Sequence, residues 1–366
     1  MAVLEELKLA PKRKSKSHPR SQGLPVPGSS GNHDAMEEPN PMITQPVTDC
    51  WFLTGATAVG KTKIGIALAQ RLQAEIISLD SMAIYRGMNI GTAKPTPEQQ
   101  TLVAHHLIDV IDPDQSFNIA QYLEAAHAKR REILKRGHQV LFVGGTPLYL
   151  KGLLRGLFEG PPANWRVRND IERELAQVGI LEGNRALHAR LENVDPVAAS
   201  QIHPHDTRRL IRALEVYRIT GKPISHQQLQ FDEGRPADQC RVFVLRRAGD
   251  ESRQRIETRV DAMIARGLID EVKELTDGGR QLGRTASQAV GYREVLDFLA
   301  GNLDSEVMVE KIKSRTRRFA KRQKTWFRSL SECRFVDIAG KVEADRIAAR
   351  ILQDGLAVGT GQPTDS

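Results

Sequence analysis

Short apolar runs alternate with helical patterns over the first part of the chain. The runs at 49–55 (DCWFLTG), 74–81 (AEIISLDS) and 138–146 (HQVLFVGGT) predict buried strands. Ile64, Leu68 and Leu72 recur at helical spacing, and residues 116–137 predict a further helix that stops at Gly137. Strands and helices in this alternation predict an α/β fold, a parallel sheet with crossover helices.

The pattern changes after residue 160. Residues 161–239 predict helices with few strand signals, and Leu210, Leu214 and Tyr217 lie on one face of one of them. The apolar run 240–247 (CRVFVLRR) predicts a return to the sheet, and the sequence beyond it predicts helices. We therefore expect a core domain at 49–160 and 240–340, a helical insertion domain at 161–239, and a C-terminal helix and tail at 341–366.

Residues 1–48 have the composition of an unstructured tail. They are rich in Pro, Gly, Ser and Lys and show no apolar period, so they cannot bury enough surface to offset the entropy of ordering. The basic run at 12–16 could touch RNA, but a solvated tail is the favoured interpretation. Met36 and Met42, just upstream of the first expected strand, are alternative translation starts.

Composition and charge narrow the class of protein. The 366 residues carry a formal charge of +8 and a pI near 9.4, which favours a polyanionic partner, nucleic acid first. No apolar run reaches the length of a membrane span, and the N-terminus lacks the apolar core of a signal peptide. Cys50, Cys240 and Cys333 form no C-x-x-C pair or disulfide framework. We therefore expect a cytoplasmic protein without a membrane partner.

Residues 55–62 read G-x-x-x-x-G-K-T, a phosphate-binding loop between a predicted strand and a predicted helix. Successive backbone N–H groups of such a loop point into one concavity at a helix N-terminus. Lys61 would reach the terminal phosphate, and the Thr62 hydroxyl would ligate Mg²⁺, the expected cofactor. The predicted diphosphate or nucleotide site comprises Gly55, Ala56, Thr57, Ala58, Val59, Gly60, Lys61 and Thr62.

The second motif of a typical ATPase, an apolar strand that ends in an acid, is harder to find. The strand at 138–146 ends in Gly144, Gly145 and Thr146, whereas the strand at 74–81 ends in Asp80. This pattern argues mildly against transfer or hydrolysis of a γ-phosphate. Asp80 lies where open α/β sheets hold ligands, although capping of the next segment explains this residue equally well when it is taken alone.

The segment 311–328 (KIKSRTRRFAKRQKTWFR) is a predicted helix without an acid. Its basic residues are Lys311, Lys313, Arg315, Arg317, Arg318, Lys321, Arg322, Lys324 and Arg328. A merely solvated helix normally interleaves acids, so this composition predicts contact with phosphates of a nucleic acid. Ile312, Phe319 and Trp326 recur every seven residues and predict one apolar packing seam. This spacing favours the core for Phe319 and Trp326, with stacking on bases as the alternative.

Seven blocks of sequence resemble the signatures of the tRNA dimethylallyltransferases, also called isopentenyl-tRNA transferases. These blocks are 55–62 (GATAVGKT), 79–95 (LDSMAIYRGMNIGTAKP), 142–154 (FVGGTPLYLKGLL), 195–223 (DPVAASQIHPHDTRRLIRALEVYRITGKP), 267–272 (GLIDEV), 289–294 (AVGYRE) and 316–328 (TRRFAKRQKTWFR). They stand in the family's order and cover about 50 to 330. Ala56 replaces a usual proline and Val59 a common serine, but neither position supplies a side-chain ligand. No C-terminal Cys/His zinc finger of the eukaryotic type is present.

The resemblance implies a P-loop NTPase-like sheet flanked by helices and a defined reaction. The N6 amine of the adenosine 3′ to the anticodon, position 37 in tRNAs that read codons beginning with U, would attack C1 of dimethylallyl diphosphate. The loop would then hold diphosphate as the leaving group. Asp80 would accept or orient the amine proton, Thr146 would contact the target nucleotide, and Arg255, favoured over Arg259, would help to neutralise the diphosphate.

The same motifs imply two partners, dimethylallyl diphosphate and the anticodon stem-loop of tRNA, and we expect a monomer. The implied tRNA-binding residues are Asp80, Ser81, Met82, Ala83, Thr146, Arg168, Arg208, Arg209, Arg212, Gln288, Gly291, Tyr292, Arg293, Arg315, Arg318, Lys321, Arg322 and Gln323. The target base must leave its stack before the amine is accessible.

Other interpretations stay open. A P-loop kinase for a nucleoside or small metabolite explains the loop and the sheet, but not the acid-free helix or the insertion. A non-catalytic RNA-binding NTPase switch is disfavoured by the missing acid after the strand at 138–146. An enzyme that prenylates free adenine nucleotides would need neither the long basic helix nor the insertion.

Overall fold

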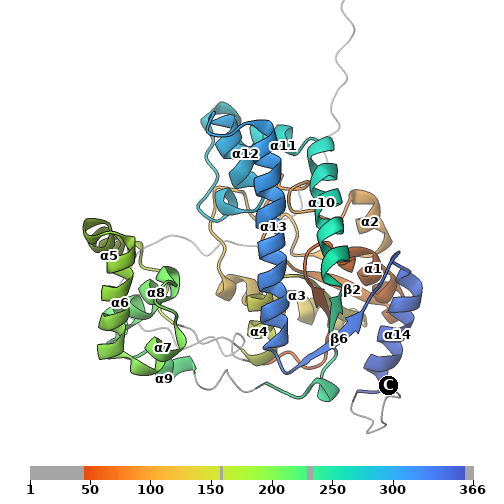
Figure 1. Ribbon diagram of the computed structural model, residues 1–366. Helices are drawn as coiled ribbons and strands as arrows, with labels where there is room; N and C mark the ends of the chain where they lie inside the picture. The colour runs from red at the N-terminus through yellow and green to blue at the C-terminus, as the bar shows by residue number, and fades with distance from the viewer. Residues whose placement is uncertain (1–44, 157–159, 229–233, 359–366) are drawn as a thin grey trace, which may run out of the picture. The chain divides into compact units, whose positions relative to one another are not determined.

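The computed structural model describes residues 45–156, 160–228 and 234–358 (Figure 1). Its strands are β1 (Trp51–Gly55), β2 (Ala74–Leu79), β3 (His105–His106), β4 (Gln139–Gly144), β5 (Val242–Arg246) and β6 (Cys333–Asp337). They form one sheet in the order β3–β2–β4–β1–β5–β6, and every neighbouring pair is parallel. The predicted parallel α/β fold is confirmed.

Two of these strands were not predicted. β6 pairs with β5 from Val242↔Cys333 to Arg246↔Asp337, so the expectation of helices alone after the fifth strand is wrong. Its sequence, CRFVD, mixes polar and apolar residues without a regular period over only five positions at the edge of the sheet. β3 is two residues long at the opposite edge, too short to give a pattern.

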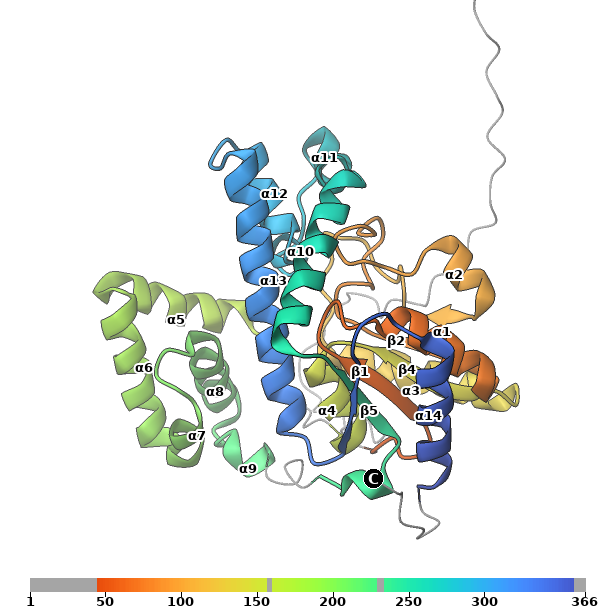
Figure 2. The same ribbon diagram turned by 45° about the vertical axis from the view of Figure 1, so that its right-hand side comes forward.

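Helices cover both faces of the sheet (Figure 2). On one face α1 (Lys61–Leu72) packs beside α14 (Ala344–Leu356), and the buried side chains of both helices join those of β1 and β5 in one core. On the other face lie α3 (Ile119–Lys135) and α4 (Pro147–Arg155), which pack through stacked Tyr122 and Tyr149 rings with centroids 3.8 Å apart. Between β2 and β3 the chain forms the short helix α2 (Pro97–Leu102).

Residues 45–48 belong to the folded part. Val47 is buried, and its N–H donates to Leu153 O at 2.7 Å. The predicted tail therefore extends too far by these residues, because a single apolar side chain ahead of β1 gives no periodic signal. The remainder of that predicted tail, residues 1–44, lies outside the described residues.

The segment after α4 forms five helices, α5 (Trp165–Val178), α6 (Ile180–Val194), α7 (Pro196–Gln201), α8 (Thr207–Thr220) and α9 (Ser225–Gln228). They bury an apolar core of their own that includes Leu191, Leu210 and Leu214. Tyr217, predicted on the same face as Leu210, is only half-buried. Between residue 160 and β5 the described residues contain no strand, and the short 3-10 helix η2 (Ala237–Gln239) leads back to the sheet.

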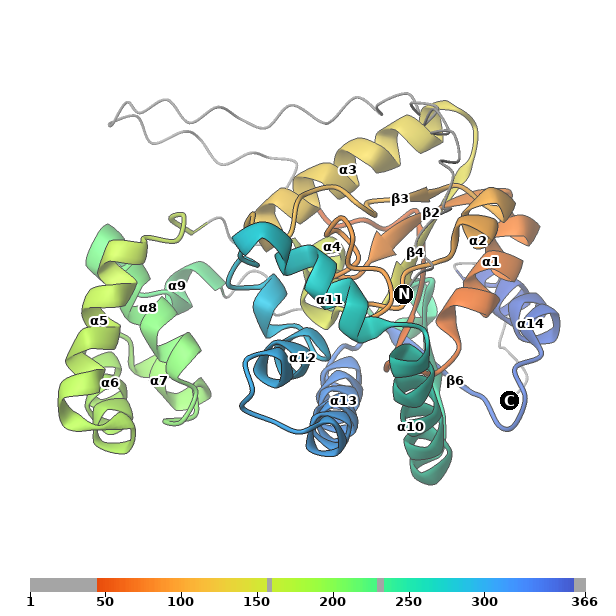
Figure 3. The same cartoon turned by 90° about the horizontal axis from the view of Figure 1, so that it is seen from above.

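The chain after β5 forms a helical layer around a third apolar core (Figure 3). Its elements are α10 (Gly249–Ala265), α11 (Leu268–Thr276), η3 (Asp277–Gly279), η4 (Ala286–Gln288), α12 (Tyr292–Leu299) and α13 (Ser305–Arg328). The 24-residue α13 packs against both α10 and α12. Among the described residues, no helix is long and apolar enough to cross a membrane.

The buried face of α13 differs from the predicted seam. Ile312 is buried as expected, but Phe319 is 38% exposed and Trp326 is half-buried. Ala320, Gln323 and Phe327 are buried in their place. The seven-residue repeat predicted the wrong buried face because one edge of α13, which carries Phe319, lines a cavity. An aromatic residue on that edge does not indicate packing against protein.

Candidate active site

A large cavity lies where the chain leaves the carboxyl ends of β1, β2 and β4, which are neighbours in the sheet. Its volume is about 1420 Å³, and its lining includes Lys61, Asp80 and Thr146. An open α/β sheet holds its ligands at this edge. Residues that the sequence separates by up to 85 positions are therefore brought to one place by the strand order.

The loop after β1 forms an anion-binding turn at the N-terminus of α1. Gly60, the N-cap of α1, has φ at 114°, and Ala58 has φ at 63°. Left-handed residues of this kind, set between residues with negative φ, turn successive backbone N–H groups into one concavity, called a nest. The first turn of α1 carries no acid. The loop residues that line the cavity are Thr57, Ala58, Gly60, Lys61 and Thr62, whereas Ala56 and Val59 are buried. A helix N-terminus with this geometry favours a phosphate group.

Lys61 lies folded back on its own loop. Its Nζ donates to Gly55 O and Ala56 O, each at 2.9 Å. Burial, with a smaller contribution from the charge of Arg259, lowers the pKa of Lys61 to about 7, although Asp80 acts in the opposite direction. A bound diphosphate would favour the charged ammonium, so binding of an anion and protonation of Lys61 are coupled.

The turns after β2 and β4 close on each other. Gly145 N and Thr146 N donate to Leu79 O at 3.0 and 3.1 Å, and Ser81 N donates to Thr146 Oγ1 at 3.1 Å. A Cβ atom on Gly144 would lie 2.1 Å from Leu79 O, so this approach requires glycine. The end of β4, where a typical ATPase would carry an acid, instead hydrogen-bonds to the turn that holds Asp80.

Asp80 combines a capping contact with a place in the cavity. Its Oδ1 accepts the N–H groups of Met82 at 2.8 Å and Ala83 at 3.3 Å. The side chain also lines the cavity. Because both bonds go to Oδ1, capping and a chemical role at the second carboxylate oxygen are compatible.

Two arginines of α10 face the phosphate loop. Arg255 and Arg259 are one helical turn apart, and both line the cavity. Arg255 Nε donates to Ala58 O at 3.0 Å. Burial lowers the pKa of Arg259 and Asp80 raises it, so Arg259 interacts electrostatically with Asp80 as well as with Lys61. The sequence ranked Arg259 below Arg255, and nothing in a charged helix face could have predicted this placement.

The predicted tRNA-binding residues fall into two groups. Those that line the cavity are Asp80, Ser81, Met82, Ala83, Thr146, Arg168, Arg208, Gln288, Gly291, Tyr292, Arg315, Arg322 and Gln323. The other five are Arg209, Arg212, Arg293, Arg318 and Lys321. Arg318 and Lys321 are exposed on α13, close in sequence to Arg322, which is exposed and lines the cavity.

Several of the predicted arginines are held by buried carboxylates. Arg168 Nε and Arg212 Nη1 donate to the two oxygens of Glu215 at 2.8 and 2.7 Å. Arg315 Nη1 donates to Glu294 at 2.6 Å, and its Nη2 donates to Gln288 O at 2.9 Å. These side chains are therefore positioned before any ligand arrives.

Gln323 joins α13 to the phosphate loop. It is buried, its Oε1 accepts from Thr57 N at 2.9 Å, and its Nε2 donates to Gly145 O at 2.6 Å. Its amide is thus committed to the turns after β1 and β4. The structure gives this residue a supporting position inside the site, which its place in a basic segment did not indicate.

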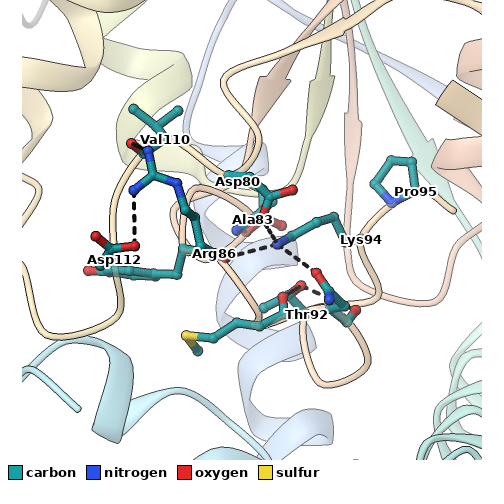
Figure 4. Close-up of polar contacts among 12 residues, drawn as sticks. Asp80, Ala83, Arg86, Thr92, Lys94, Pro95, Val110 and Asp112 are labelled. Atoms are coloured by element: carbon teal, nitrogen blue, oxygen red, sulfur yellow. Dashed lines mark hydrogen bonds and ion pairs between the residues drawn. The ribbon is translucent and has the colours of Figure 1, made fainter. Parts of the chain in front are cut away.

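One wall of the cavity is the segment 91–95, which the sequence marked only as part of a longer block of resemblance. Lys94 is almost fully buried there, and its Nζ donates to Tyr85 O, Asn89 Oδ1 and Asp109 Oδ1 at 2.8, 2.9 and 2.6 Å (Figure 4). Three acceptors satisfy all three protons of the ammonium. Lys94 therefore fixes the wall and does not offer its charge to a ligand.

The fold and the cavity define an α/β protein of the P-loop class with a basic helix beside its phosphate site. The family model described as IPP transferase matches residues 83–330. This is more than half of the chain, and the chain belongs to that family.

Several relatives agree with this assignment. A tRNA dimethylallyltransferase of Rhodopirellula baltica is 48% identical over 81% of this chain and 89% of its own. A tRNA dimethylallyltransferase of Pelotomaculum thermopropionicum is 44% identical over 82% of this chain and 94% of its own.

Solved structures agree as well. The tRNA isopentenylpyrophosphate transferase of Bacillus halodurans, 36% identical, superposes with a TM-score of 0.60 over 86% of this chain and 99% of its own. A eukaryotic dimethylallyltransferase acting on tRNA is 26% identical and superposes with a TM-score of 0.69 over 87% of this chain and 81% of its own.

Proposed function

We propose that this protein transfers the dimethylallyl group of dimethylallyl diphosphate to N6 of the adenosine at position 37, 3′ to the anticodon, in tRNAs that read codons beginning with U, and releases diphosphate. One observation carries the proposal: the phosphate loop, Asp80 and Thr146 line the same cavity as Arg315 and Arg322 of the basic helix. A site for a diphosphate and a surface for RNA thus share one wall. We further propose that the protein is a cytoplasmic monomer.

The phosphate loop would hold the leaving group. Negative charge accumulates on the bridging oxygen as the bond from C1 to oxygen breaks. The N–H groups of the loop, Lys61 and the two arginines of α10 would stabilise that charge most in the transition state, which accelerates transfer.

Asp80 would serve the attacking amine. The lone pair of an exocyclic adenine amine is delocalised into the ring, so the amine is a poor nucleophile. A carboxylate against its N–H would localise the lone pair and take the proton as the bond to C1 forms. Thr146, whose Oγ1 lies 3.1 Å from Ser81 N, would contact the nucleotide beside it.

The donor set fits Mg²⁺ bound with its substrate. Among the described residues there is no group of three or more His, Cys, Asp or Glu side chains that could hold a metal. Mg²⁺ commonly keeps several waters and binds one or two protein oxygens together with substrate phosphates. Thr62, which lines the cavity, would supply one such oxygen through its hydroxyl. When bound, the ion would neutralise charge on the departing diphosphate.

The exposed cations of α13 should act through phosphates. We expect the double variant Lys321→Ala, Arg322→Ala to raise the KM for tRNA and to flatten its salt dependence by roughly one unit of slope for each phosphate that the variant no longer neutralises. The KM for dimethylallyl diphosphate should barely change, because among the described residues no hydrogen bond or ion pair joins Lys321 or Arg322 to the phosphate loop. Initial rates at several salt concentrations measure both. An equal rise in the KM values for tRNA and for dimethylallyl diphosphate would instead make α13 part of the diphosphate site.

Phe319 should act differently from its basic neighbours. It is exposed in the cavity lining, and the Arg322 guanidinium lies 6.0 Å from its ring centroid. Stacking of one base on an aromatic ring contributes about 1–3 kcal/mol, so we expect Phe319→Ala to weaken tRNA binding roughly tenfold with an unchanged salt slope. Phe319→Leu, which keeps apolar volume, is the control for packing. Binding by Phe319→Ala within twofold of wild type would exclude stacking.

Labelled donor tests the proposed activity directly. The protein is incubated with dimethylallyl diphosphate labelled in the prenyl group, Mg²⁺ and bulk tRNA, and the labelled tRNA is cut into oligonucleotides whose sequences place the label. We expect the label on adenosine from position 37. Label on free adenine nucleotides, or phosphate transferred from γ-labelled ATP to a nucleoside, would replace the proposal with one of the alternatives.

A further inference from the structure

Glu271 is a buried carboxylate that lies outside the phosphate site. It belongs to α11, is 8% exposed, and faces the loop that leads into the cavity wall 91–95. Its Oε2 accepts from Asn89 N at 2.9 Å and from Ile90 N at 2.7 Å. Its Oε1 accepts from Gly91 N at 3.2 Å and from the Tyr292 hydroxyl at 2.6 Å. Four donors from two separate segments therefore converge on two oxygens.

Tyr292, the side-chain partner of Glu271, also packs against the same loop. A Cβ atom on Gly91 would lie 2.4 Å from Tyr292 Cε2, so the ring touches the loop backbone directly. The Tyr292 side chain is fully buried, and burial together with the Glu271 carboxylate raises the pKa of its hydroxyl. The hydroxyl therefore stays protonated and donates to Glu271 at neutral pH.

The contacts continue to the basic helix. Tyr292 begins α12, directly after the turn 288–291, which lines the cavity. Arg315 of α13 holds this turn through Gln288 O and through Glu294, whose own Oε2 accepts from Gly291 N at 2.8 Å. A continuous set of bonds thus runs from α13 through Tyr292 and Glu271 to the wall 91–95.

We infer that Glu271 is a positioning residue, by which the turn 288–292 beside the basic helix holds the wall 91–95 at the distance from Asp80 that prenyl transfer requires. The inference rests on the proposed function for its catalytic consequence. A carboxylate suits this task because both oxygens accept two bonds each. A carboxamide has one acceptor oxygen and would turn its NH₂ toward two of the four donors.

Glu271→Gln keeps the size of the side chain but removes its charge and one of its two acceptor oxygens. With enzyme in excess over tRNA and saturating dimethylallyl diphosphate, we expect its single-turnover rate constant to fall roughly tenfold or more, because small misplacements in a site are costly. The affinity for inorganic diphosphate should stay within about twofold, since Glu271 shares no partner with the phosphate loop. Glu274→Gln, the same change at an exposed position of α11, is the matched control and should keep the wild-type rate.

Gly91→Ala disturbs the same contact from the loop side. We expect a similar loss of rate, and we expect the double variant Gly91→Ala, Glu271→Gln to be little slower than either single variant, because both changes break one contact. Losses that multiply in the double variant would show that Glu271 acts independently of the wall, which would overturn the inference.

Amplitude and hydrogen exchange distinguish positioning from folding. A smaller reacting fraction with an unchanged rate constant in Glu271→Gln would mean a merely structural role and would refute the inference. Amide exchange at Asn89, Ile90 and Gly91 should accelerate in Glu271→Gln but not in Glu274→Gln, whatever the activity is. If wild-type protein fails to prenylate tRNA, the proposed function falls, and the exchange rates still decide whether Glu271 holds the wall.

Discussion

Asp80→Asn is expected to lower the rate constant for prenyl transfer by at least roughly 10²-fold, the lower range for a positioned acid–base group. Asparagine keeps the shape and the acceptor oxygen of Asp80 but lacks its charge and basicity. The amine would then lose the group that localises its lone pair and takes its proton. The affinity for tRNA should change much less, because Asp80 contributes one contact among many.

The same substitution isolates chemistry from capping. Asparagine caps a turn about as well as aspartate, so the bonds to Met82 N and Ala83 N survive in the variant. Asp304 offers a matched control, since its Oδ1 caps α13 through Val307 N at 2.8 Å at an exposed position outside the cavity lining. Asp304→Asn should keep both the rate and the thermal midpoint.

Single-turnover transfer at saturating tRNA, measured beside the thermal midpoint, decides the role of Asp80. A slow variant with a wild-type midpoint supports acid–base chemistry. A wild-type rate in Asp80→Asn would leave Asp80 with its cap alone and would require another acceptor, such as the Thr146 hydroxyl, for the amine proton.

Local sequence predicts the elements whose signals are local. The runs of β1, β2, β4 and β5 are mostly apolar and mostly buried, and the phosphate loop is one unbroken motif. β6 escapes prediction because an edge strand of five residues is covered on fewer sides and can carry polar residues such as Arg334. The order of strands, which brings Asp80 beside the loop of Lys61, is set by packing between distant segments.

Side chains whose roles depend on such packing could not be read from the sequence. Phe319 occupies a position of a regular repeat, yet it is exposed because a cavity replaces protein on that side of α13. Gln323 sits among cations and is buried against the phosphate loop. Glu271 resembles any acid of an amphipathic helix until the loop at 89–91 is placed on it. Each depends on a partner far away in the chain.

Lys61→Ala is expected to slow transfer roughly 10²-fold, the usual cost of removing one donor aimed at charge that develops in the transition state. Diphosphate binding should weaken as well, because the ground state already carries charge at this position. Lys135→Ala, which removes an exposed lysine of α3 outside the cavity lining, controls for net charge and should behave as wild type. ATP should support no phosphoryl transfer by either protein.

The pH dependence of diphosphate binding tests whether the Lys61 ammonium itself makes the contact. With the pKa of Lys61 lowered to about 7 in the unliganded protein, most molecules carry the charge below that pH and must take up a proton on binding above it. The advantage of wild type over Lys61→Ala should therefore be largest near pH 6 and shrink as the pH rises through 7 toward about 9. Titration of diphosphate itself affects both proteins equally and cancels in their ratio. A ratio that stays constant over this range would mean that Lys61 binds diphosphate without a change of protonation, and that burial does not hold its pKa near neutrality.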